Sequence, residues 1–251
     1  MRVWGITDIG LKRRENQDTY AFDAFCLPDS AVAVVCDGMG GVNGGRLASS
    51  TAVSTFMEEL RGNADADMTD ERLRDAELYA VKQANLAVYA RSLEDAAYRG
   101  MGTTLVSAIA FPDMAILCNV GDSRAYHIDG NGISRVTRDH SVVESLIESG
   151  DITPEQARTH PSRNLVTRAL GPESTIKCDS FTIPFPKGTS LLLCSDGLIV
   201  TVEDHEILDI VHAESDGASV LSRLLKLALE RGAPDNVTAV LIRNEEERQD
   251  G

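Results

Sequence analysis

Hydrophobic residues along this chain follow two periods, and each period predicts one kind of element. Short apolar runs rich in β-branched residues are typical of strands. Asp129-Gly130-Asn131-Gly132 is a strong hairpin signal, and Pro112-Asp113 is another turn between two apolar runs, so much of the sheet is expected to be antiparallel. The predicted strands are 3–8, 31–36, 103–111, 114–120, 125–128, 133–137, 180–183, 190–194 and 237–243.

Apolar residues three and four positions apart predict helices between the groups of strands. Segments 47–60 and 70–93 form one expected antiparallel helix pair, joined by the turn at 62–68. Ser141 with Glu144 has the spacing of a capping box, and Thr153-Pro154-Glu155-Gln156 begins another short helix. A last amphipathic helix spans 221–229 and ends before Gly232.

Helices that come in pairs between strands, rather than alternating with single strands, predict an α+β fold. Two antiparallel sheets packed face to face, with helix pairs outside them, would use these elements economically. We find no Pro/Ser-rich linker, repeat or composition break. We therefore expect one domain over residues 1–244, followed by a short acidic tail, 245–251.

The composition is that of an ordinary globular protein. The chain has 251 residues, of which 43% are hydrophobic and 25% charged. A chain of this length can bury about 70% of its surface on folding without stabilising disulfides, metals or partners. A bound metal ion would therefore have a catalytic role. The longest apolar runs fall far short of the roughly 20 residues that span a bilayer, and the N-terminus lacks the apolar core of a signal peptide. We expect a cytoplasmic protein with no membrane partner.

Cysteine usage and charge exclude two further classes. Five cysteines, an odd number without a CxxC pair, argue against a disulfide or zinc framework. The formal net charge of -15 repels phosphate backbones and argues against a nucleic-acid partner. The five cysteines are Cys26, Cys36, Cys118, Cys178 and Cys194.

Carboxylates stand at the ends of several predicted strands. Three apolar runs end at Asp37, Asp122 and Asp196, and Asp235 comes just before a fourth. Asp-Gly at a strand end can be simple turn chemistry. Four carboxylates meeting at one sheet rim, however, would repel one another unless a cation neutralised them, and oxygen ligands favour Mg²⁺ or Mn²⁺.

Two polar loops lie next to these carboxylates in the sequence. In the loop 10–18, Arg13 offers a fork for phosphoryl oxygens and Asp18 could orient water, although the loop also fits a solvated basic turn. The glycine-rich loop 37–45 has the position of a dinucleotide fingerprint, but Asn43 stands where its third glycine belongs. Its glycines would instead let the backbone approach a metal, with the Gly38 carbonyl as a ligand.

Taken together, the motifs resemble those of the metal-dependent protein phosphatases, the type 2C serine/threonine family, in its compact bacterial form. The resemblance covers nearly the whole chain and implies a four-layer sandwich of two antiparallel sheets flanked by helix pairs. The motifs that carry it are RRENQD (13–18), DGMGG (37–41), GMGTTL (100–105), GDSR (121–124), DHS (139–141), SDG (195–197) and DNVT (235–238).

The resemblance also implies a role for each matched residue. Two Mn²⁺ or Mg²⁺ ions would hold a bridging water that attacks phosphorus without a covalent phosphoenzyme. Segment 139–170 corresponds to a flap that helps to select substrates. The implied metal ligands are Asp37, bridging both ions, the Gly38 carbonyl, Asp196 and Asp235, with Asp122 for a weaker third ion. Arg13 would bind phosphate, Asp18 would hold metal-bound water, and Gln17, Asn236, Gly102 and Thr103 would support the site.

The sequence departs from the family pattern at two of these positions. Met39 stands where animal members have a histidine thought to donate a proton to the leaving group, and a thioether cannot do so. Gln17 replaces a common glutamate. His140 is a candidate for the missing donor, although an isolated histidine is more often structural.

These observations favour hydrolysis of phosphoserine and phosphothreonine in proteins over two alternatives. A phosphopeptide-binding pseudophosphatase would have lost metal carboxylates, and none is lost here. A nucleotide-binding oxidoreductase rests only on the glycine-rich loop. The expected partners are phosphorylated proteins, including a serine/threonine kinase, and the chain is expected to be a monomer.

Overall fold

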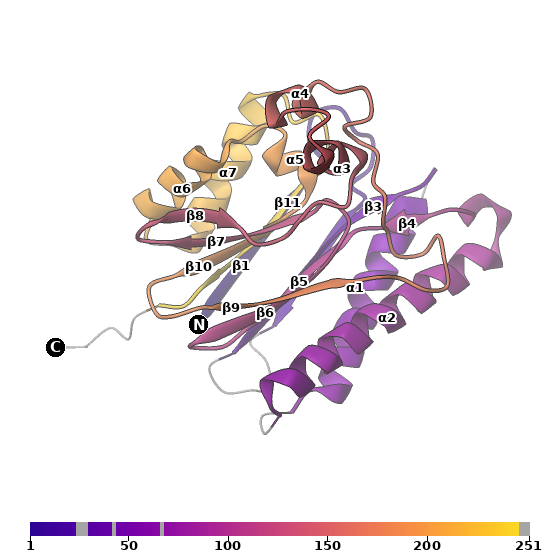
Figure 1. Cartoon of the computed structure of the whole chain (residues 1–251), viewed down its shortest axis with the longest axis horizontal. Coiled ribbons are helices and arrows are strands. Elements are labelled where there is room, and N and C mark those ends of the chain that lie inside the picture. The colour runs from indigo at the N-terminus through magenta and orange to yellow at the C-terminus, as the bar shows by residue number, and fades with distance from the viewer. Residues whose placement is uncertain (24–29, 42–43, 66–67, 246–251) are drawn as a thin grey trace.

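The computed structural model describes residues 1–23, 30–41, 44–65 and 68–245 of the chain. These residues form four layers, in which two sheets pack face to face and helices cover the outer face of each (Figure 1). Cys26 and Asn43, both named in the sequence analysis, lie outside the described residues, as does most of the expected tail. The division at residue 244 stays a prediction.

Both sheets are antiparallel throughout their described pairs, as expected from the short turns. Sheet A contains, in spatial order, β1 (Arg2–Asp8), β11 (Val237–Arg243), β10 (Ser190–Cys194), β7 (Arg124–Asp129) and β8 (Gly132–Arg135). Sheet B contains β2 (Asp18–Asp23), β3 (Ala31–Met39), β5 (Leu105–Ala110), β6 (Met114–Val120) and β9 (Asp179–Pro184), and the short β4 (Gly102–Thr103) pairs with β3.

The helices divide between the two outer layers and one end of the sandwich (Figure 1). Sheet B is covered by α1 (Gly44–Asn63) and α2 (Asp70–Glu94), which is followed by the single turn η1 (Ala96–Tyr98). Sheet A is covered by α6 (Asp204–Ala213) and α7 (Gly217–Glu230), with the short α5 (Asp196–Ile199) beside them. The segment 139–170, which we call the flap, carries α3 (Val142–Ser149) and α4 (Pro154–Arg158).

The alternation of side chains along the strands positions the site. In a strand, every second residue faces the same way. On β3, Ala31, Ala33 and Val35 belong to the apolar core between the two sheets, whereas Val32 and Val34 pack under the helices. The same alternation carries Asp37 onto the inter-sheet face at the end of the strand. The core between the sheets therefore changes from apolar to polar at this end.

The predicted α+β sandwich with external helices is confirmed. The strands expected at 114–120, 190–194 and 237–243 have the predicted bounds, and the expected helix pair corresponds to α1 and α2. The expected strand 103–111 is interrupted at Thr104, which separates β4 from β5. Among the described elements, β2, η1, α5 and α6 were not predicted.

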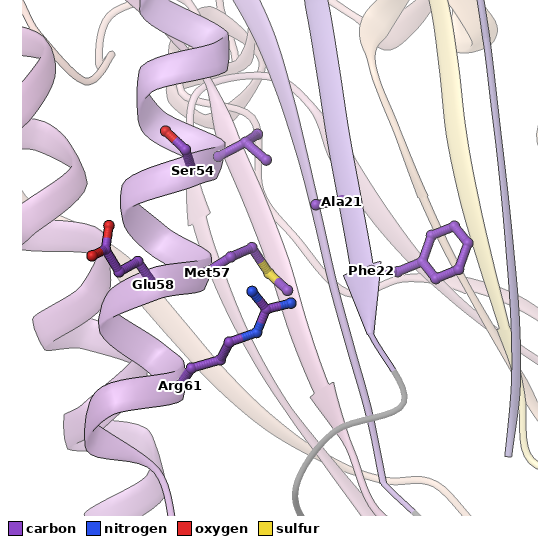
Figure 2. Close-up of a pocket in the computed structure, with 7 residues that line it drawn as sticks. Ala21, Phe22, Ser54, Met57, Glu58 and Arg61 are labelled. Atoms are coloured by element: carbon purple, nitrogen blue, oxygen red, sulfur yellow. The ribbon is translucent and has the colours of Figure 1, made fainter.

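A surface groove of about 480 Å³ lies between β2 and α1 (Figure 2). Met57 and Arg61 extend from α1 toward β2, while the Phe22 ring points away from the helix (Figure 2). Asp18 begins β2, whereas the groove contacts Ala21 and Phe22 in the second half of the strand. The groove is thus separate from the strand-end aspartates that the sequence analysis singled out. No helix in the described part of the chain is both long and apolar enough to cross a membrane.

Candidate active site

The polar end of the inter-sheet core starts with two aspartates on neighbouring strands. Asp18 on β2 lies directly opposite Asp37 on β3 in the antiparallel register. Such a pair places the Cβ atoms about 5 Å apart, where like charges are destabilising. Burial, followed by the charges of Asp18 and Asp196, raises the pKa of Asp37 well above its ordinary value.

Sheet A brings two further aspartates to the same place. Asp196 is the first residue of α5, two residues after the end of β10, and its charge acts on Asp37. Burial and the charge of Asp235 raise the pKa of Asp196 to about 6. Burial, opposed by bonds from Thr238 and Ser195, raises the pKa of Asp18 to about 7. The fold therefore brings together the carboxylates of both sheets.

Asp122 joins this cluster from the turn after β6. Its side chain is only 9% exposed, and burial together with the charge of Asp196 raises its pKa to about 7. The charge of Asp122 also acts on Asp37. All the aspartates that the sequence analysis singled out are thus electrostatically coupled.

The main chain of Asp37 is fixed by two threonines. The Thr104 hydroxyl accepts from the Asp37 amide at 2.9 Å, and the Thr103 hydroxyl donates to the Asp37 carbonyl at 2.8 Å. A Cβ atom at Gly102 would lie 2.9 Å from the Leu170 carbonyl oxygen. These contacts agree with a supporting role for Gly102 and Thr103 through close packing.

Gly38 is required by a close approach of backbone to backbone. A Cβ atom there would lie 2.1 Å from the carbonyl oxygen of Gly45 in the first turn of α1 and 2.6 Å from that of Gln17. The Gln17 carbonyl accepts from the Gly38 amide at 3.2 Å and from the Ser49 hydroxyl at 2.6 Å. Any side chain at Gly38 would push these segments apart.

The loop that carries Arg13 is held by one buried side chain, Asn236. Its Oδ1 accepts from the Gln17 amide at 2.9 Å, and its Nδ2 donates to the carbonyls of Ile9 at 2.9 Å and Glu15 at 3.0 Å. The loop is therefore attached at both ends to the residue after Asp235. Arg13 Nη2 lies 2.5 Å from Asp235 Oδ2, so its fork reaches the carboxylate cluster.

Two hydroxyl groups near Asp18 were not assigned a role from the sequence. The Ser195 hydroxyl donates to Asp18 Oδ2 at 2.8 Å and accepts from the Thr238 amide at 3.0 Å. Thr238 Oγ1 lies 2.7 Å from Thr7 Oγ1. These bonds connect β2 of sheet B to sheet A. The sequence signal that could have identified them is the alternation of side chains along a strand. Ser195 and Thr238 lie two residues from positions of β10 and β11 whose side chains face the core between the sheets.

His140 is buried and engaged at both ring nitrogens. Nδ1 accepts from the Gly121 amide at 3.0 Å, and Nε2 lies 3.1 Å from Asp179 Oδ2 and 3.0 Å from Arg168 Nη1. Burial lowers the pKa of the ring, which fits a neutral imidazole with its proton on Nε2 facing Asp179. The geometry therefore links the flap to the turn that carries Asp122.

The residues present fit a divalent cation by their chemistry. Asp18 Oδ1 and Asp196 Oδ1 are buried without a hydrogen-bond partner among the described residues, and the charges of Asp18 and Asp196 act on Asp37. A cation would relieve both conditions. The set is not a closed cage, because no three His, Cys, Asp or Glu side chains in the described ranges are grouped to hold a metal. Asp235 is instead engaged by Arg13.

Comparison with known proteins gives one consistent answer. The family profile of protein phosphatase 2C matches residues 12–241. The chain belongs to this family. It is 35% identical to the serine/threonine phosphatase Stp of Listeria welshimeri over 239 residues, which cover 94% of this chain and 93% of the relative.

Solved structures of the same family are also similar. The serine/threonine phosphatase Stp1 of Staphylococcus aureus is 35% identical and has a TM-score of 0.89, covering 97% of this chain and 95% of its own. The catalytic domain of the phosphatase PstP, solved with two manganese ions, is 31% identical with a TM-score of 0.83 and covers 96% of each chain. The present chain is therefore a serine/threonine protein phosphatase of a metal-dependent family, as its motifs predicted.

Proposed function

We propose that this phosphatase hydrolyses phosphoserine and phosphothreonine esters of proteins at the polar end of the inter-sheet core. The observation that carries the proposal is the meeting of carboxylates from both sheets: Asp37, opposite Asp18 in sheet B, and Asp196, just after β10 in sheet A, are half-buried, and burial together with neighbouring carboxylates raises the pKa of each. Such carboxylates are costly unless a positive charge joins them.

The proposed ligands are those of the sequence analysis. Asp37, the Gly38 carbonyl, Asp196 and Asp235 would hold two Mn²⁺ or Mg²⁺ ions, and Asp122 would contribute to a weaker third site. When bound, such ions neutralise the carboxylates, withdraw charge from phosphoryl oxygens and lower the pKa of coordinated water toward neutrality.

The remaining residues bind and orient the reactants. Arg13 presents a planar fork suited to two phosphoryl oxygens. Asp18 keeps one oxygen on the Ser195 hydroxyl, so its second oxygen, Oδ1, is free to accept from an attacking water. Ser195 and Thr238 therefore act as positioning residues for Asp18. His140, with both nitrogens engaged, would position the flap and the Asp122 turn.

A thiol nucleophile is not needed in this scheme. Burial raises the pKa of Cys36 and Cys194, and both side chains are fully buried. Cys118 is buried as well, and its pKa is raised by Cys178 and by burial. Thiols in such surroundings are poor nucleophiles. Direct attack by water, without a phosphoenzyme, agrees with this distribution.

The proposal is tested by Asp196→Asn with Asp75→Asn as a matched control. Asp75 is exposed on α2, away from the cluster. We expect the Asp196→Asn protein to fold, by circular dichroism, and to lose at least about 100-fold in Mn²⁺-dependent hydrolysis of a phosphothreonine peptide. Asp75→Asn should match the parent protein. Full activity of Asp196→Asn would exclude it from the site.

Other features of the proposal extend beyond this site. The kinase partner, the monomeric state and the cytoplasmic location remain predictions from the sequence and its family. Co-purification with a serine/threonine kinase and sedimentation of the purified chain would test the first two.

A further inference from the structure

Both oxygens of the Asp235 carboxylate already have a donor. Oδ1 accepts from the Asn236 amide at 2.8 Å, and Oδ2 accepts from Arg13 Nη2 at 2.5 Å. Asp235 is one of the proposed metal ligands, yet neither of its oxygens is unoccupied. A divalent cation that binds Asp235 must therefore share an oxygen with a donor or displace one.

Of the two donors, Arg13 is the one able to leave. The Asn236 amide is main chain, and the Asn236 side chain is tied to three backbone groups of the Arg13 loop. The Arg13 side chain is 53% exposed, on a loop whose backbone is held by these bonds and by the bond from the Leu11 amide to the Ala233 carbonyl. Rotation of the Arg13 side chain alone would release Asp235.

The charge of Arg13 also acts on the rest of the cluster. Besides Asp235, the carboxylates of Asp37 and Asp196 favour its charged form and raise its pKa. A divalent cation bound to Asp235 would repel the guanidinium of Arg13 at this distance and would weaken its hold on the carboxylate.

We propose that Arg13 is an internal counter-cation that neutralises Asp235 in the metal-free protein and is displaced when a divalent cation takes this carboxylate. The displaced guanidinium is then free to bind phosphoryl oxygens. This inference rests on the proposed metal site. Under this proposal, binding of the metal to Asp235 releases Arg13 for phosphate binding. In the metal-free enzyme Arg13 stays paired with Asp235 and binds phosphate less well.

The chain offers a matched control next to Arg13. Arg14 is exposed on the same loop and forms no ion pair with the described residues. Replacing it with glutamine removes the same formal charge from nearly the same place. Any general electrostatic effect of the loop on metal affinity is therefore present in Arg14→Gln, whereas the exchange with Asp235 is lost only in Arg13→Gln.

The test is the affinity for Mn²⁺, measured by the electron paramagnetic resonance signal of free Mn²⁺ in titrations of the parent, Arg13→Gln and Arg14→Gln proteins. We expect Arg13→Gln to bind its first Mn²⁺ about two- to five-fold more tightly than Arg14→Gln, the range given by a partly exposed ion pair. Thermal unfolding gives a second readout: Arg13→Gln should lower the melting temperature of the metal-free protein, and Mn²⁺ should remove the difference.

Each outcome is decisive. Equal or weaker Mn²⁺ binding by Arg13→Gln, relative to Arg14→Gln, would overturn the exchange while leaving the metal site intact. A folded parent protein that binds no Mn²⁺ would overturn the proposed function and the inference together.

Discussion

Glu77 is a carboxylic acid with no exposed surface, on the face of α2 that packs against sheet B. Its Oε1 accepts from the Ser107 hydroxyl at 2.7 Å, and its Oε2 has no partner among the described residues. Burial raises the pKa of Glu77 to about 8, although bonds from Ser107 and Cys118 oppose the shift. The folded protein therefore holds this side chain as a neutral acid over much of the physiological pH range.

The sign of the resulting pH dependence follows from linkage. Between the ordinary value of 4.5 and about 8, the folded state keeps a proton that the unfolded state releases. Stability from this group is complete below the lower value and is lost as the pH rises through the window. Glu77→Gln should therefore gain about 1–3 kcal/mol relative to the parent protein between pH 5 and pH 8.

Thermal unfolding from pH 5 to pH 9 measures this difference, which corresponds to several degrees in melting temperature. Glu71→Gln, an exposed position on the same helix, serves as the control and should show no such trend. A Glu77→Gln protein whose advantage does not grow with pH would show that Glu77 is ionised in the fold.

At the residue scale, the convergence of the aspartates could be predicted from the sequence, whereas the side chains that form hydrogen bonds with them could not. Asp37, Asp196 and Asp235 stand at strand ends in recognisable motifs, so their convergence was predictable. Ser195 and Thr238 carry no such mark, because a serine or threonine in a strand has many uses. The Arg13–Asp235 bond was also not predictable, since it depends on how the loop lies over β11.

At the scale of elements, one of the partly buried ion pairs that attach the flap to the sandwich lies at the start of the flap. Arg124 on β7 holds Asp139 with Nε at 3.0 Å from Oδ1 and Nη2 at 2.7 Å from Oδ2, and its Nη1 reaches the Tyr126 hydroxyl at 3.1 Å. The Asp139 side chain is 9% exposed. A second pair, Arg158 to Glu203, joins α4 to the start of α6, but Arg158 is 67% exposed.

We expect these two attachments to differ in strength. Arg124→Lys keeps the charge but loses the fork, and should lower stability by about 1–2 kcal/mol because Asp139 is left partly unpaired. Arg158→Lys should change stability by less than about 0.5 kcal/mol, since exposed pairs contribute little. Urea unfolding measures both. Hydrogen exchange of 142–170 should rise in Arg124→Lys alone; equal effects of the two changes would contradict this ranking.

Two of the elements missed from the sequence, α6 and β2, begin in ways that local sequence signals do not mark. The helix α6 begins with a capping box in which Glu203 takes the N-cap position, where serine or threonine is usual. Glu206 takes the position where glutamate is usual. The strand β2 follows a charged loop and is only partly buried on most of its length. Their places are decided by tertiary packing, whereas the longer α1, α2 and α7 are specified by their own apolar faces.

At the scale of the whole molecule, the proposed metal site joins the two sheets. Sheet B supplies Asp37 and sheet A supplies Asp196 and Asp235, so a bound cation would bridge two layers otherwise held by the apolar core between them. It would also neutralise part of a formal charge of -15. Binding to the folded state alone stabilises it by mass action.

We therefore expect Mn²⁺ at about 100 times its dissociation constant to stabilise the parent protein by about 3 kcal/mol, or several degrees in melting temperature. The Asp37→Asn protein should lose most of this gain, and K⁺ at matched ionic strength should not reproduce it. An equal rise in the parent and in Asp37→Asn would place the ion elsewhere on the acidic surface.

The central claim is that a divalent cation at the carboxylate cluster is needed for phosphate-ester hydrolysis. The most direct measurement is hydrolysis of p-nitrophenyl phosphate and of a phosphothreonine peptide after removal of metal with EDTA, with Mn²⁺, Mg²⁺, Ca²⁺ or Zn²⁺ added back. We expect Mn²⁺ or Mg²⁺ to restore activity in the parent protein and not in Asp37→Asn. Undiminished activity after complete metal removal, or equal restoration in Asp37→Asn, would contradict the account.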